Sequence, residues 1–355
     1  MKVLIVDDSI VYRTAITQAL KEVSGLEVFK AVSNGKIAID FLKHNPDISL
    51  ITLDMEMPVM DGLETIKAIR EFNKDVIIIV FSSFTVRGAE KTIDALNAGA
   101  DDFVPKIEGK GDIEESIKMI RLELLQKIEA FKGNKHKKIV DIAPKPVVKK
   151  TQMAIKTIPG IVDEMMIKPK LIVIGCSTGG PEALAQIFKN IKIGSSVPIL
   201  IVQHMPAMFT EKLASMLDKV SVLSISEAKN NQRISNGHCY IAPGDYHMTL
   251  KKDLTLSMNQ EEKVCFVRPA VDVLFKSVAE NYSEQVLSIV LTGMGEDGMR
   301  GAKELEKKGA YQFIQDKESS VVWGMPGAIS RAGINVTELS LNEIAMLIDE
   351  ISKRI

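Results

Sequence analysis

The chain contains few of the residues that build disulfides or membrane spans. Three cysteines occur among its 355 residues. None of them forms a Cys-x-x-Cys pair, so a disulfide framework is excluded and a reducing compartment is indicated. The longest apolar run, at 76–81, has about six residues, well short of the ~18 that a membrane-spanning helix needs. The charged pair Asp7-Asp8 comes too early for a signal peptide. We therefore expect a cytoplasmic protein without membrane insertion.

An excess of basic charge is also missing from the parts of the chain that are expected to fold. Residues 1–131 hold 22 acidic and 16 basic residues, and residues 169–355 hold 21 and 20. Neither part has the basic surface typical of nucleic-acid binding, so no nucleic-acid partner is expected. Residues 132–168 hold three acidic and nine basic residues, a composition typical of an unfolded, lysine-rich linker.

Residues 1–131 alternate short apolar runs with amphipathic stretches. The runs expected as strands are 3–6, 28–32, 50–53, 76–81 and 102–104. Helical spacing of apolar residues lies between these runs, and a fifth helix is predicted at about Ile113–Phe131. Five strand–helix units in series predict a parallel sheet that is covered on both faces.

A second alternating pattern begins after the break at 132–168. The break contains several prolines and no sustained periodicity, and we interpret it as a flexible linker with one short helix near Val162–Met166. Strands are predicted at 171–175, 197–202 and 287–291, and an antiparallel hairpin from the alternation at 247–258 and 263–267. Residues 169–355 should therefore form a doubly wound, mostly parallel α/β domain with an antiparallel hairpin.

Polar side chains follow the strands of the first domain at the points where these strands end. Asp7 and Asp8 follow the first strand, Asp54 ends the third, and Ser82 and Lys106 follow the fourth and fifth. Because the carboxyl ends of parallel strands share one edge of a sheet, we expect these side chains to converge. Carboxylate oxygens suit Mg²⁺, and a carboxylate beside this ion can accept a phosphoryl group while Lys106 neutralises charge.

The first domain resembles the receiver domain of bacterial response regulators over residues 1 to about 125. The resemblance implies a flavodoxin-like fold with a five-stranded parallel sheet, a Mg²⁺ cofactor and a histidine kinase as phosphodonor. The implied site residues are the phosphorylated Asp54, the metal ligands Asp7, Asp8, Asp54 and Glu56 (through its main-chain oxygen), and the switch residues Ser82, Phe103 and Lys106.

One position departs from the receiver pattern. Members of this family usually have proline directly after the lysine, whereas here Ile107 follows Lys106 and Pro105 precedes it. A loop of different geometry is therefore expected at 105–111.

A glycine-rich turn, Gly-Cys-Ser-Thr-Gly-Gly-Pro at 175–181, follows the first strand of the second domain. Its glycines permit a tight turn that presents the Ser177 hydroxyl at the sheet edge, and the free amides of the helix behind it can stabilise an oxyanion. A phosphate-binding turn is one alternative, but the GxGxxG spacing fails at Ser177 and no GKS or GKT sequence follows. A plain tight turn fits the pattern equally well.

A serine nucleophile needs a base and an acid that orients this base. His204 and Asp297 each follow a buried strand at the edge expected for Ser177, whereas His238 and His247 flank a loop and are less clearly directed there. Singly, His204 and Asp297 also fit capping roles. Together with Ser177 they predict a Ser-His-Asp triad, and their order along the chain is no objection.

Six motifs follow one another between residue 170 and about residue 350: GCSTGGP (175–181), QHMP (203–206), APGDYH (242–247), RPAVD (268–272), LTGMGEDG (291–298) and WGMPGA (323–328). With these motifs the segment resembles the catalytic domain of chemotaxis receptor protein-glutamate methylesterases. The resemblance implies Ser177 as nucleophile, His204 as general base and Asp297 as the orienting acid. It also implies that Thr178 helps to place the histidine and that the Met294 amide donates to the oxyanion.

The two resemblances together imply phosphorylation-activated hydrolysis of glutamate γ-methyl esters on methyl-accepting chemotaxis receptors, with glutamine deamidation at the same site. They imply a chemotaxis histidine kinase as phosphodonor and no cofactor for the esterase site, and we expect a monomer. The alternative is a response regulator whose output domain binds a nucleotide or DNA. Its DNA-binding form predicts a short basic output segment, unlike residues 169–355.

Overall fold

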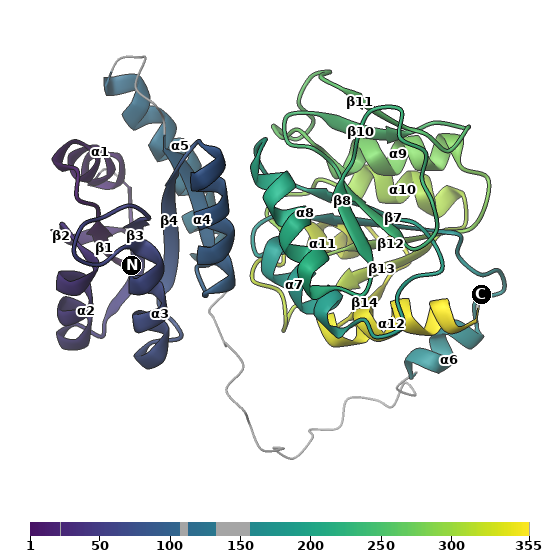
Figure 1. Cartoon of the computed structure of the whole chain (residues 1–355), viewed down its shortest axis with the longest axis horizontal. Helices are drawn as coiled ribbons and strands as arrows, with labels where there is room; N and C mark the ends of the chain where they lie inside the picture. Colours follow the sequence, from purple (N-terminus) through teal and green to yellow (C-terminus); the bar gives the residue numbers. More distant parts are fainter. Residues whose placement is uncertain (22, 107–112, 133–156, 355) are drawn as a thin grey trace. The chain divides into compact units, whose positions relative to one another are not determined.

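The structure, a computed structural model, describes residues 1–21, 23–106, 113–132 and 157–354 (Figure 1). The chain forms two compact units, Met1–His136 and Lys137–Ile355. Most of the expected linker at 132–168 lies outside the described residues, as does the loop at 107–111 with Ile107. Within the described ranges, no helix has both the length and the apolar character that crossing a bilayer requires.

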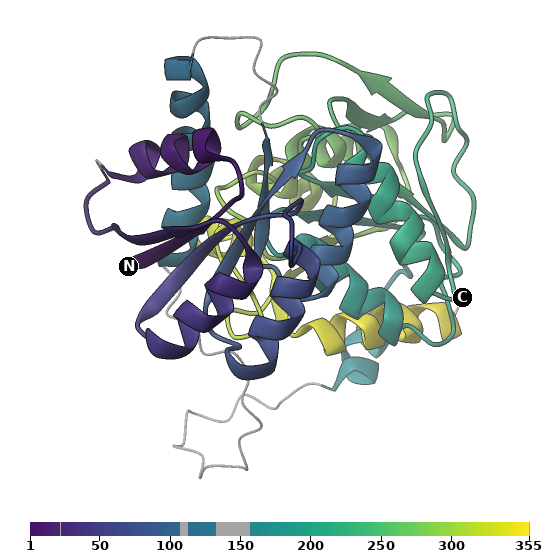
Figure 2. The same cartoon turned by 60° about the vertical axis from the view of Figure 1, so that its left-hand side comes forward.

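The first unit is a parallel sheet with the strand order β2-β1-β3-β4-β5, which confirms the predicted five-stranded parallel sheet. Its elements are β1 (Lys2–Val6), α1 (Ile10–Lys21), β2 (Glu27–Val32), α2 (Gly35–His44), β3 (Ile48–Asp54), α3 (Gly62–Phe72), β4 (Ile77–Ser83), α4 (Val86–Asn97), β5 (Asp102–Lys106) and α5 (Ile113–Lys132). Helix α1 packs on α5, and α2, α3 and α4 pack in series on the opposite face (Figure 2). Because β1 and β3 pair in parallel, their carboxyl ends are neighbours near the centre of the sheet.

Local sequence signals start the helices of this unit. Asp61 and Glu64 form a capping box at α3, in which each side chain accepts a hydrogen bond from the other residue's amide. Asn34 and Thr85 cap α2 and α4 through their side chains. Pro105 fits into β5 because β5 is an edge strand, so its missing N–H is not needed by a further strand.

The second unit contains a seven-stranded parallel sheet with the order β14-β13-β12-β6-β7-β9-β8, and a separate antiparallel pair, β10-β11. Its elements are α6 (Ile158–Asp163), β6 (Leu171–Cys176), α7 (Gly180–Asn190), β7 (Ile199–Gln203), α8 (Phe209–Val220), β8 (Ser224–Glu227), β9 (His238–Ile241), β10 (His247–Leu250), β11 (Leu256–Asn259), α9 (Val271–Asn281), β12 (Val286–Val290), α10 (Met299–Lys307), β13 (Tyr311–Gln315), α11 (Met325–Arg331), β14 (Thr337–Leu339) and α12 (Leu341–Lys353). Helices α9 and α10 pack together over one face, and α8, α7 and α12 pack in series (Figure 1).

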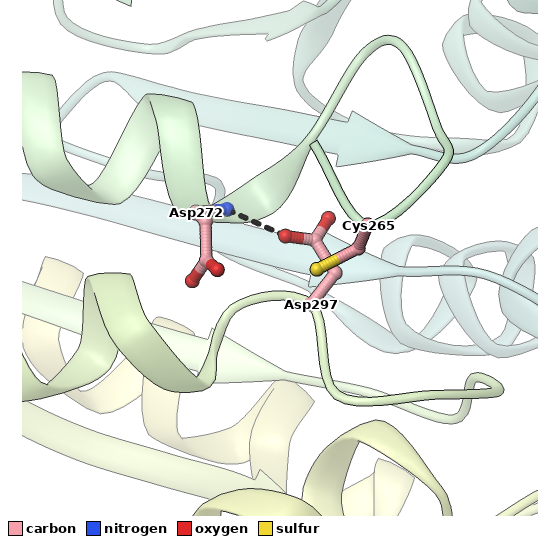
Figure 3. Close-up of side chains that lie close together, drawn as sticks. All are labelled: Cys265, Asp272 and Asp297. Carbon is pink, nitrogen blue, oxygen red and sulfur yellow. Dashed lines mark hydrogen bonds between the residues drawn. The ribbon is translucent and has the colours of Figure 1, made fainter. Parts of the chain in front are cut away.

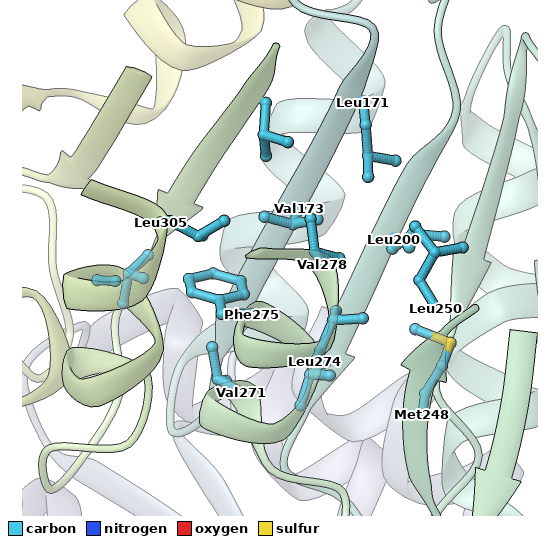
Figure 4. Close-up of a cluster of buried hydrophobic side chains, with 14 of the residues drawn as sticks. Leu171, Val173, Leu200, Met248, Leu250, Val271, Leu274, Phe275, Val278 and Leu305 are labelled. Atoms are coloured by element: carbon cyan, nitrogen blue, oxygen red, sulfur yellow. The ribbon is translucent and has the colours of Figure 1, made fainter. Parts of the chain in front are cut away.

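The main core of this unit lies between the sheet and helices α9 and α10 (Figure 4). Leu171 and Val173 of β6 pack with Leu274 and Phe275 of α9 and with Leu305 of α10, and all five side chains are fully buried. Burying a side chain of this size stabilises the fold by roughly 1.5–3 kcal/mol. The core therefore fixes β6, the strand that leads to Ser177, against α9.

The antiparallel hairpin is present, but its predicted extent was partly wrong. Both of its strands, β10 and β11, lie within 247–259. Residues 263–267 instead contain a tight turn in which Val264 and Val267 pair. The alternation at 263–267 failed as a strand signal because Cys265 and Phe266 have positive φ, which reverses the chain direction.

Helix α6 begins earlier than the predicted short helix near Val162–Met166. Thr157 caps it by accepting a hydrogen bond from the Gly160 amide, and Pro159 lies in its first turn. Ile158 and Val162 are buried, α6 packs on α12, and an ion pair joins the two segments. The described end of the expected linker is therefore part of the second unit's packing.

Candidate functional site

Asp7, Asp54 and Lys106 meet at the carboxyl edge of the first sheet. Lys106 Nζ lies 2.8 Å from Asp54 Oδ2 and 3.2 Å from Asp7 Oδ2. Asp7 and Asp54 are buried, whereas Asp8 is exposed. Carboxylate oxygens of the three acidic residues all lie within 4.8 Å of one another. The structure thus brings together the acidic residues that the strand ends placed at this edge.

Burial governs the protonation of this cluster. It raises the pKa of Asp7 and of Asp54 above the ordinary aspartate value, and the Lys106 ammonium opposes the rise at both. Burial would lower the pKa of Lys106, but Asp54 and Asp7 outweigh it and hold that pKa above its ordinary value. Asp7 Oδ2 accepts no hydrogen bond from the described residues, although Lys106 lies at ion-pair distance. A Mg²⁺ ion fits beside this buried oxygen, because it takes carboxylate ligands and would offset the repulsion between them.

The other predicted receiver residues lie around this cluster. Ser82 is buried on β4, and its hydroxyl donates to a main-chain oxygen of α4 at 2.9 Å. Phe103 is buried on β5. The amide of Glu56 donates to Asp54 Oδ1 at 3.2 Å, which places the main chain of Glu56 beside the carboxylates. The switch and ligand roles of these residues stay predictions.

Ser177 stands in the turn between β6 and α7. Its amide donates to Thr292 O at 3.0 Å, and its own main-chain oxygen accepts from Gln203 Nε2 at 3.0 Å. The turn also needs Gly180, because a Cβ there would lie 2.0 Å from Gln203 Oε1. Ser177 is therefore held from both sides, by the residues that end β7 and follow β12.

His204 and Asp297 follow the strands on either side of β6 and form a hydrogen bond, with 2.7 Å between Nε2 and Oδ2. The His204 amide donates to Cys176 O at 3.1 Å, and its oxygen accepts from Gln203 Nε2 at 3.1 Å. Gln203 thus ties the main chain of Ser177 to that of His204. Within the described residues no hydrogen bond joins Ser177 Oγ to His204. Catalytic hydrogen bonds are often long until substrate binds, and Nδ1 is the ring nitrogen left for the serine.

The Asp297 carboxylate is surrounded by donors. Oδ1 accepts from the amides of Asp272 at 2.9 Å and Gly298 at 3.0 Å, and Oδ2 accepts from the Val271 amide at 2.6 Å as well as from His204. Val271 and Asp272 start α9, whose own N-cap residue supplies no side-chain bond, so Asp297 caps this helix from a distant part of the chain. Burial would raise the pKa of Asp297, but the interaction with His204 and the two helix amides outweigh it and hold that pKa below its ordinary value.

The predicted supporting residues lie in the turns beside Ser177. Thr178 is buried, and its role in placing the histidine stays a prediction. Met294 follows β12, and among the described residues its amide has no acceptor. A Cβ on the neighbouring Gly293 would lie only 2.9 Å from Ser177 Cβ. This close approach brings the turn of Met294 against the serine, as an oxyanion donor requires.

The other two histidines of this unit are used in different contacts. His238 begins β9 and stacks on Tyr240, with 5.2 Å between the ring centroids. His247 is buried; its Nδ1 accepts from the Ala270 amide at 3.2 Å, and its Nε2 lies 3.0 Å from Glu262 O. His247 therefore anchors the segment before α9, and His204 is the histidine that meets an acid at the sheet edge.

Cys265 and Asp272 also lie beside Asp297, which the sequence did not reveal (Figure 3). One ligand atom from each of the three residues lies within 4.8 Å of the others. Asp272 is 1% exposed, and its Oδ2 accepts no hydrogen bond from the described residues. Burial raises the pKa of Asp272 against the opposing Gly301 amide, and the Asp297 charge adds to the rise. The group is a poor metal site, because the donors around Asp297 already occupy the roughly four acceptor positions of its carboxylate.

The turn that carries Cys265 has a strained backbone. The Val267 amide donates to Val264 O at 3.0 Å, and the Val264 amide donates to Val267 O at 3.2 Å. The φ angles between them are +51° at Cys265 and +65° at Phe266. Two positive φ values define a type I′ turn, which favours Asn-Gly. A left-handed residue with a Cβ costs roughly 1–2 kcal/mol, so both central residues are held in an unfavourable conformation.

Both units match models of known families. Residues 3–118 match the response regulator receiver domain, and residues 172–348 match the CheB methylesterase family. The fold and the two sites thus define a response regulator whose second domain is of the CheB methylesterase type.

Full-length relatives identify the family. A protein-glutamate methylesterase/protein-glutamine glutaminase of Trichodesmium erythraeum is 41% identical, over 100% of this chain and 99% of its own length. The one of Nocardioides sp. is 40% identical, over 97% of this chain and 93% of its own length. The Thermotoga maritima CheB methylesterase catalytic domain is a similar solved structure: 37% identity, 52% of this chain, 100% of that chain and a TM-score of 0.49. The chain belongs to the family of protein-glutamate methylesterases/protein-glutamine glutaminases, and this membership does not favour a nucleotide- or DNA-binding output.

Proposed function

We propose that the chain hydrolyses γ-methyl esters of glutamate residues in chemotaxis receptors, with Ser177, His204 and Asp297 as the catalytic triad. The observation that carries this proposal is the 2.7 Å bond between His204 Nε2 and Asp297 Oδ2 at the sheet edge where Ser177 stands. The names of the full-length relatives support methyl esters of protein glutamates as the substrate, and they also support hydrolysis of protein glutamine side chains.

In the first step, Ser177 Oγ attacks the ester carbonyl carbon while His204 Nδ1 takes the hydroxyl proton. The Met294 amide and the N-terminus of α7 receive the oxyanion of the tetrahedral intermediate. Collapse breaks the bond to the methoxy oxygen, which takes the proton from His204 and leaves as methanol. Water then attacks the acyl-enzyme with His204 as base, which releases the glutamate carboxylate and restores Ser177. A primary amide passes through the same steps and releases ammonia.

Asp297 determines which ring nitrogen of His204 carries the proton. Because its pKa is held below its ordinary value, Asp297 is ionised at neutral pH. An ionised carboxylate at Nε2 keeps the proton on that nitrogen and leaves Nδ1 free as the base. It also stabilises the imidazolium that forms when His204 takes the serine proton.

In the receiver domain, Asp54 accepts the phosphoryl group of a histidine kinase, and this phosphorylation activates the hydrolase. Asp7, Asp8, Asp54 and the main-chain oxygen of Glu56 would hold Mg²⁺, which neutralises charge on the transferring group. A carboxylate oxygen of Asp54 forms the new bond to phosphorus while the phosphorus–nitrogen bond of the kinase phosphohistidine breaks, and the kinase imidazole leaves. Lys106 lies 2.8 Å from that carboxylate and compensates the added negative charge.

Methanol release from methylated receptor membranes tests the esterase chemistry. Ser177→Ala should abolish release while phosphorylation of Asp54 continues, because the two sites use separate residues. His204→Gln should lower kcat by about 10³-fold or more. His238→Gln is the matched control, since His238 stacks on Tyr240 instead of meeting an acid. Continued methanol release by Ser177→Ala would remove this serine from the nucleophile role.

A small-molecule phosphodonor tests whether phosphorylation activates the hydrolase. The full-length chain should release methanol faster after the donor is added, and Asp54→Asn should keep the slow rate with and without it. An equal rate before and after phosphorylation of the unmodified chain would contradict activation.

A further inference from the structure

The turn at 264–267 presents a large aromatic side chain to solvent. Phe266 is 92% exposed, although its φ of +65° is one that glycine or asparagine adopts more easily. An exposed aromatic ring gains nothing from burial within its own chain, so folding alone does not explain why it occupies a strained position. Strain of this kind collects at functional sites.

This turn borders the proposed catalytic triad. Cys265 directs its sulfur towards the Asp297 carboxylate, and a carboxylate oxygen lies within 4.8 Å of it (Figure 3). Phe266 is the next residue and is open to solvent while Cys265 is partly buried. Phe266 is therefore the exposed neighbour, along the chain, of a residue that lies beside Asp297.

The segment that carries the turn is braced at its base. Arg268 donates to the main-chain oxygens of Gln260 and Glu261, each at 2.7 Å. Its guanidinium also pairs with Asp245 at 2.7 Å. Together with the reciprocal bonds across the turn, these contacts hold the main chain of Phe266 in place before any partner arrives. A preorganised aromatic residue loses little freedom on binding and is an efficient anchor.

We infer that Phe266 is a substrate-selecting contact, which packs against apolar side chains of the receptor polypeptide next to the methylated glutamate. The inference rests on the proposed function. A glutamate ester that belongs to a protein brings its flanking residues with it, and these must lie over the surface around the triad. A small ester has no such flanks, so it reaches Ser177 without touching Phe266.

Two kinds of substrate separate this role from a structural one in the full-length chain. Phe266→Asn should lower kcat/KM for methanol release from methylated receptor membranes about tenfold, chiefly through KM. Hydrolysis of p-nitrophenyl acetate should stay within about twofold. Asparagine accepts the positive φ, so the thermal midpoint should hold or rise. Phe266→Tyr should keep the receptor activity, and Met346→Gln, at an exposed residue of α12, is the control for loss of an apolar surface.

Each outcome decides the matter. Equal losses on both substrates would mean that Phe266 shapes the catalytic site. Unchanged activity on receptor membranes would mean that Phe266 does not contact the receptor. Either result overturns the inference and leaves the proposed function standing. Sedimentation of the unmodified chain and of Phe266→Asn tests for a contact between two copies. A concentration-dependent dimer of the unmodified chain that the substitution abolishes would assign the ring to a second copy and would overturn the inference as well. Failure of the unmodified chain to release methanol would overturn the proposed function, and the inference with it.

Discussion

Asp54 in the first unit and Asp297 in the second are both buried aspartates at the carboxyl edge of a parallel sheet, yet their surroundings push the pKa in opposite directions. Asp54 accepts one main-chain amide and lies beside Lys106 and a second buried carboxylate, Asp7. Its pKa is raised. Asp297 accepts three amides and the His204 ring, and its pKa is lowered.

The difference follows from the task proposed for each carboxylate. A phosphoacceptor has to form a new bond and share a cation, so its oxygens cannot all be engaged by fixed donors. An orienting acid has to stay ionised and motionless, which saturation with donors achieves. The number of fixed donors around a strand-end aspartate therefore separates a reacting carboxylate from a positioning one.

The largest expected effect comes from Asp297→Asn. Loss of the charge removes the force that keeps the Nε2 proton in place, so kcat for methanol release should fall about 10³–10⁴-fold. The amide also caps α9 less well, which should lower the free energy of unfolding of this unit by about 1–3 kcal/mol. Asp54→Asn, the matched change in the first unit, should block phosphorylation and leave the unstimulated rate intact. Equal basal rates in Asp297→Asn and the unmodified chain would show that hydrolysis does not need this carboxylate, and would contradict the difference in role between Asp54 and Asp297.

A smaller effect is expected from Gln203→Met, which keeps side-chain length but removes the donor that joins Ser177 to His204. We expect kcat/KM to fall about 10–100-fold, because the main chains of Ser177 and His204 lose the side chain that joins them, and a small displacement of reacting groups slows a reaction strongly. Gln312→Met is the control: Gln312 is a buried glutamine of β13 that bonds Ser288 and a main-chain oxygen of α10. It should lower the melting temperature similarly without changing kcat/KM. If both variants lose activity alike, Gln203 acts through stability and not through position.

The smallest effect concerns Asp272, whose pKa is raised mainly by burial. Above the unfolded-state pKa, ionisation of this carboxyl favours the unfolded chain, in which water hydrates the charge, over the folded state, in which the carboxyl is buried. Asp272→Asn should therefore raise the melting temperature slightly at neutral pH. The gain should vanish as the pH falls below about 4, where both states are protonated. Asp297→Asn should show the opposite sign over the same range, because a lowered pKa contributes stability that is lost as the pH falls. Melting curves recorded from about pH 2 to pH 7 cover the range in which both effects should disappear. A shift of the same sign in the two variants at neutral pH would contradict the assignment.

The first sheet, the strands β6, β7 and β12 of the second sheet, and the gathering of strand-end residues could be predicted from the sequence. Apolar runs located the strands, and parallel strands end at one edge whatever their loops do. This rule needs only the order of elements, so it brought Asp7, Asp54 and Lys106 together, and likewise His204 and Asp297.

Contacts that depend on loops could not be predicted in this way. Cys265 and Asp272 reach Asp297 because a segment after β11 turns back through a type I′ turn, and Cys-Phe is a poor sequence signal for that turn. Gln203 lay in a motif already singled out, QHMP. Its bonds to two main-chain oxygens follow from side-chain direction, which residue spacing does not encode. The cap of α9 could not be predicted for a different reason. The capping residue, Asp297, accepts a hydrogen bond from the Asp272 amide, 25 residues away along the chain.

In many enzymes the groups that carry out the reaction are poorly suited to stability, and replacing them gives a sturdier but inactive protein. Asp297 is built differently, because the carboxylate that faces His204 also closes the first turn of α9. A lineage that ceased to need ester hydrolysis would be free to lose Ser177, yet selection for a folded chain alone would retain this aspartate. The presence of the acid in a distant homologue is therefore no sign that the homologue is still an enzyme, and the serine is the residue to inspect.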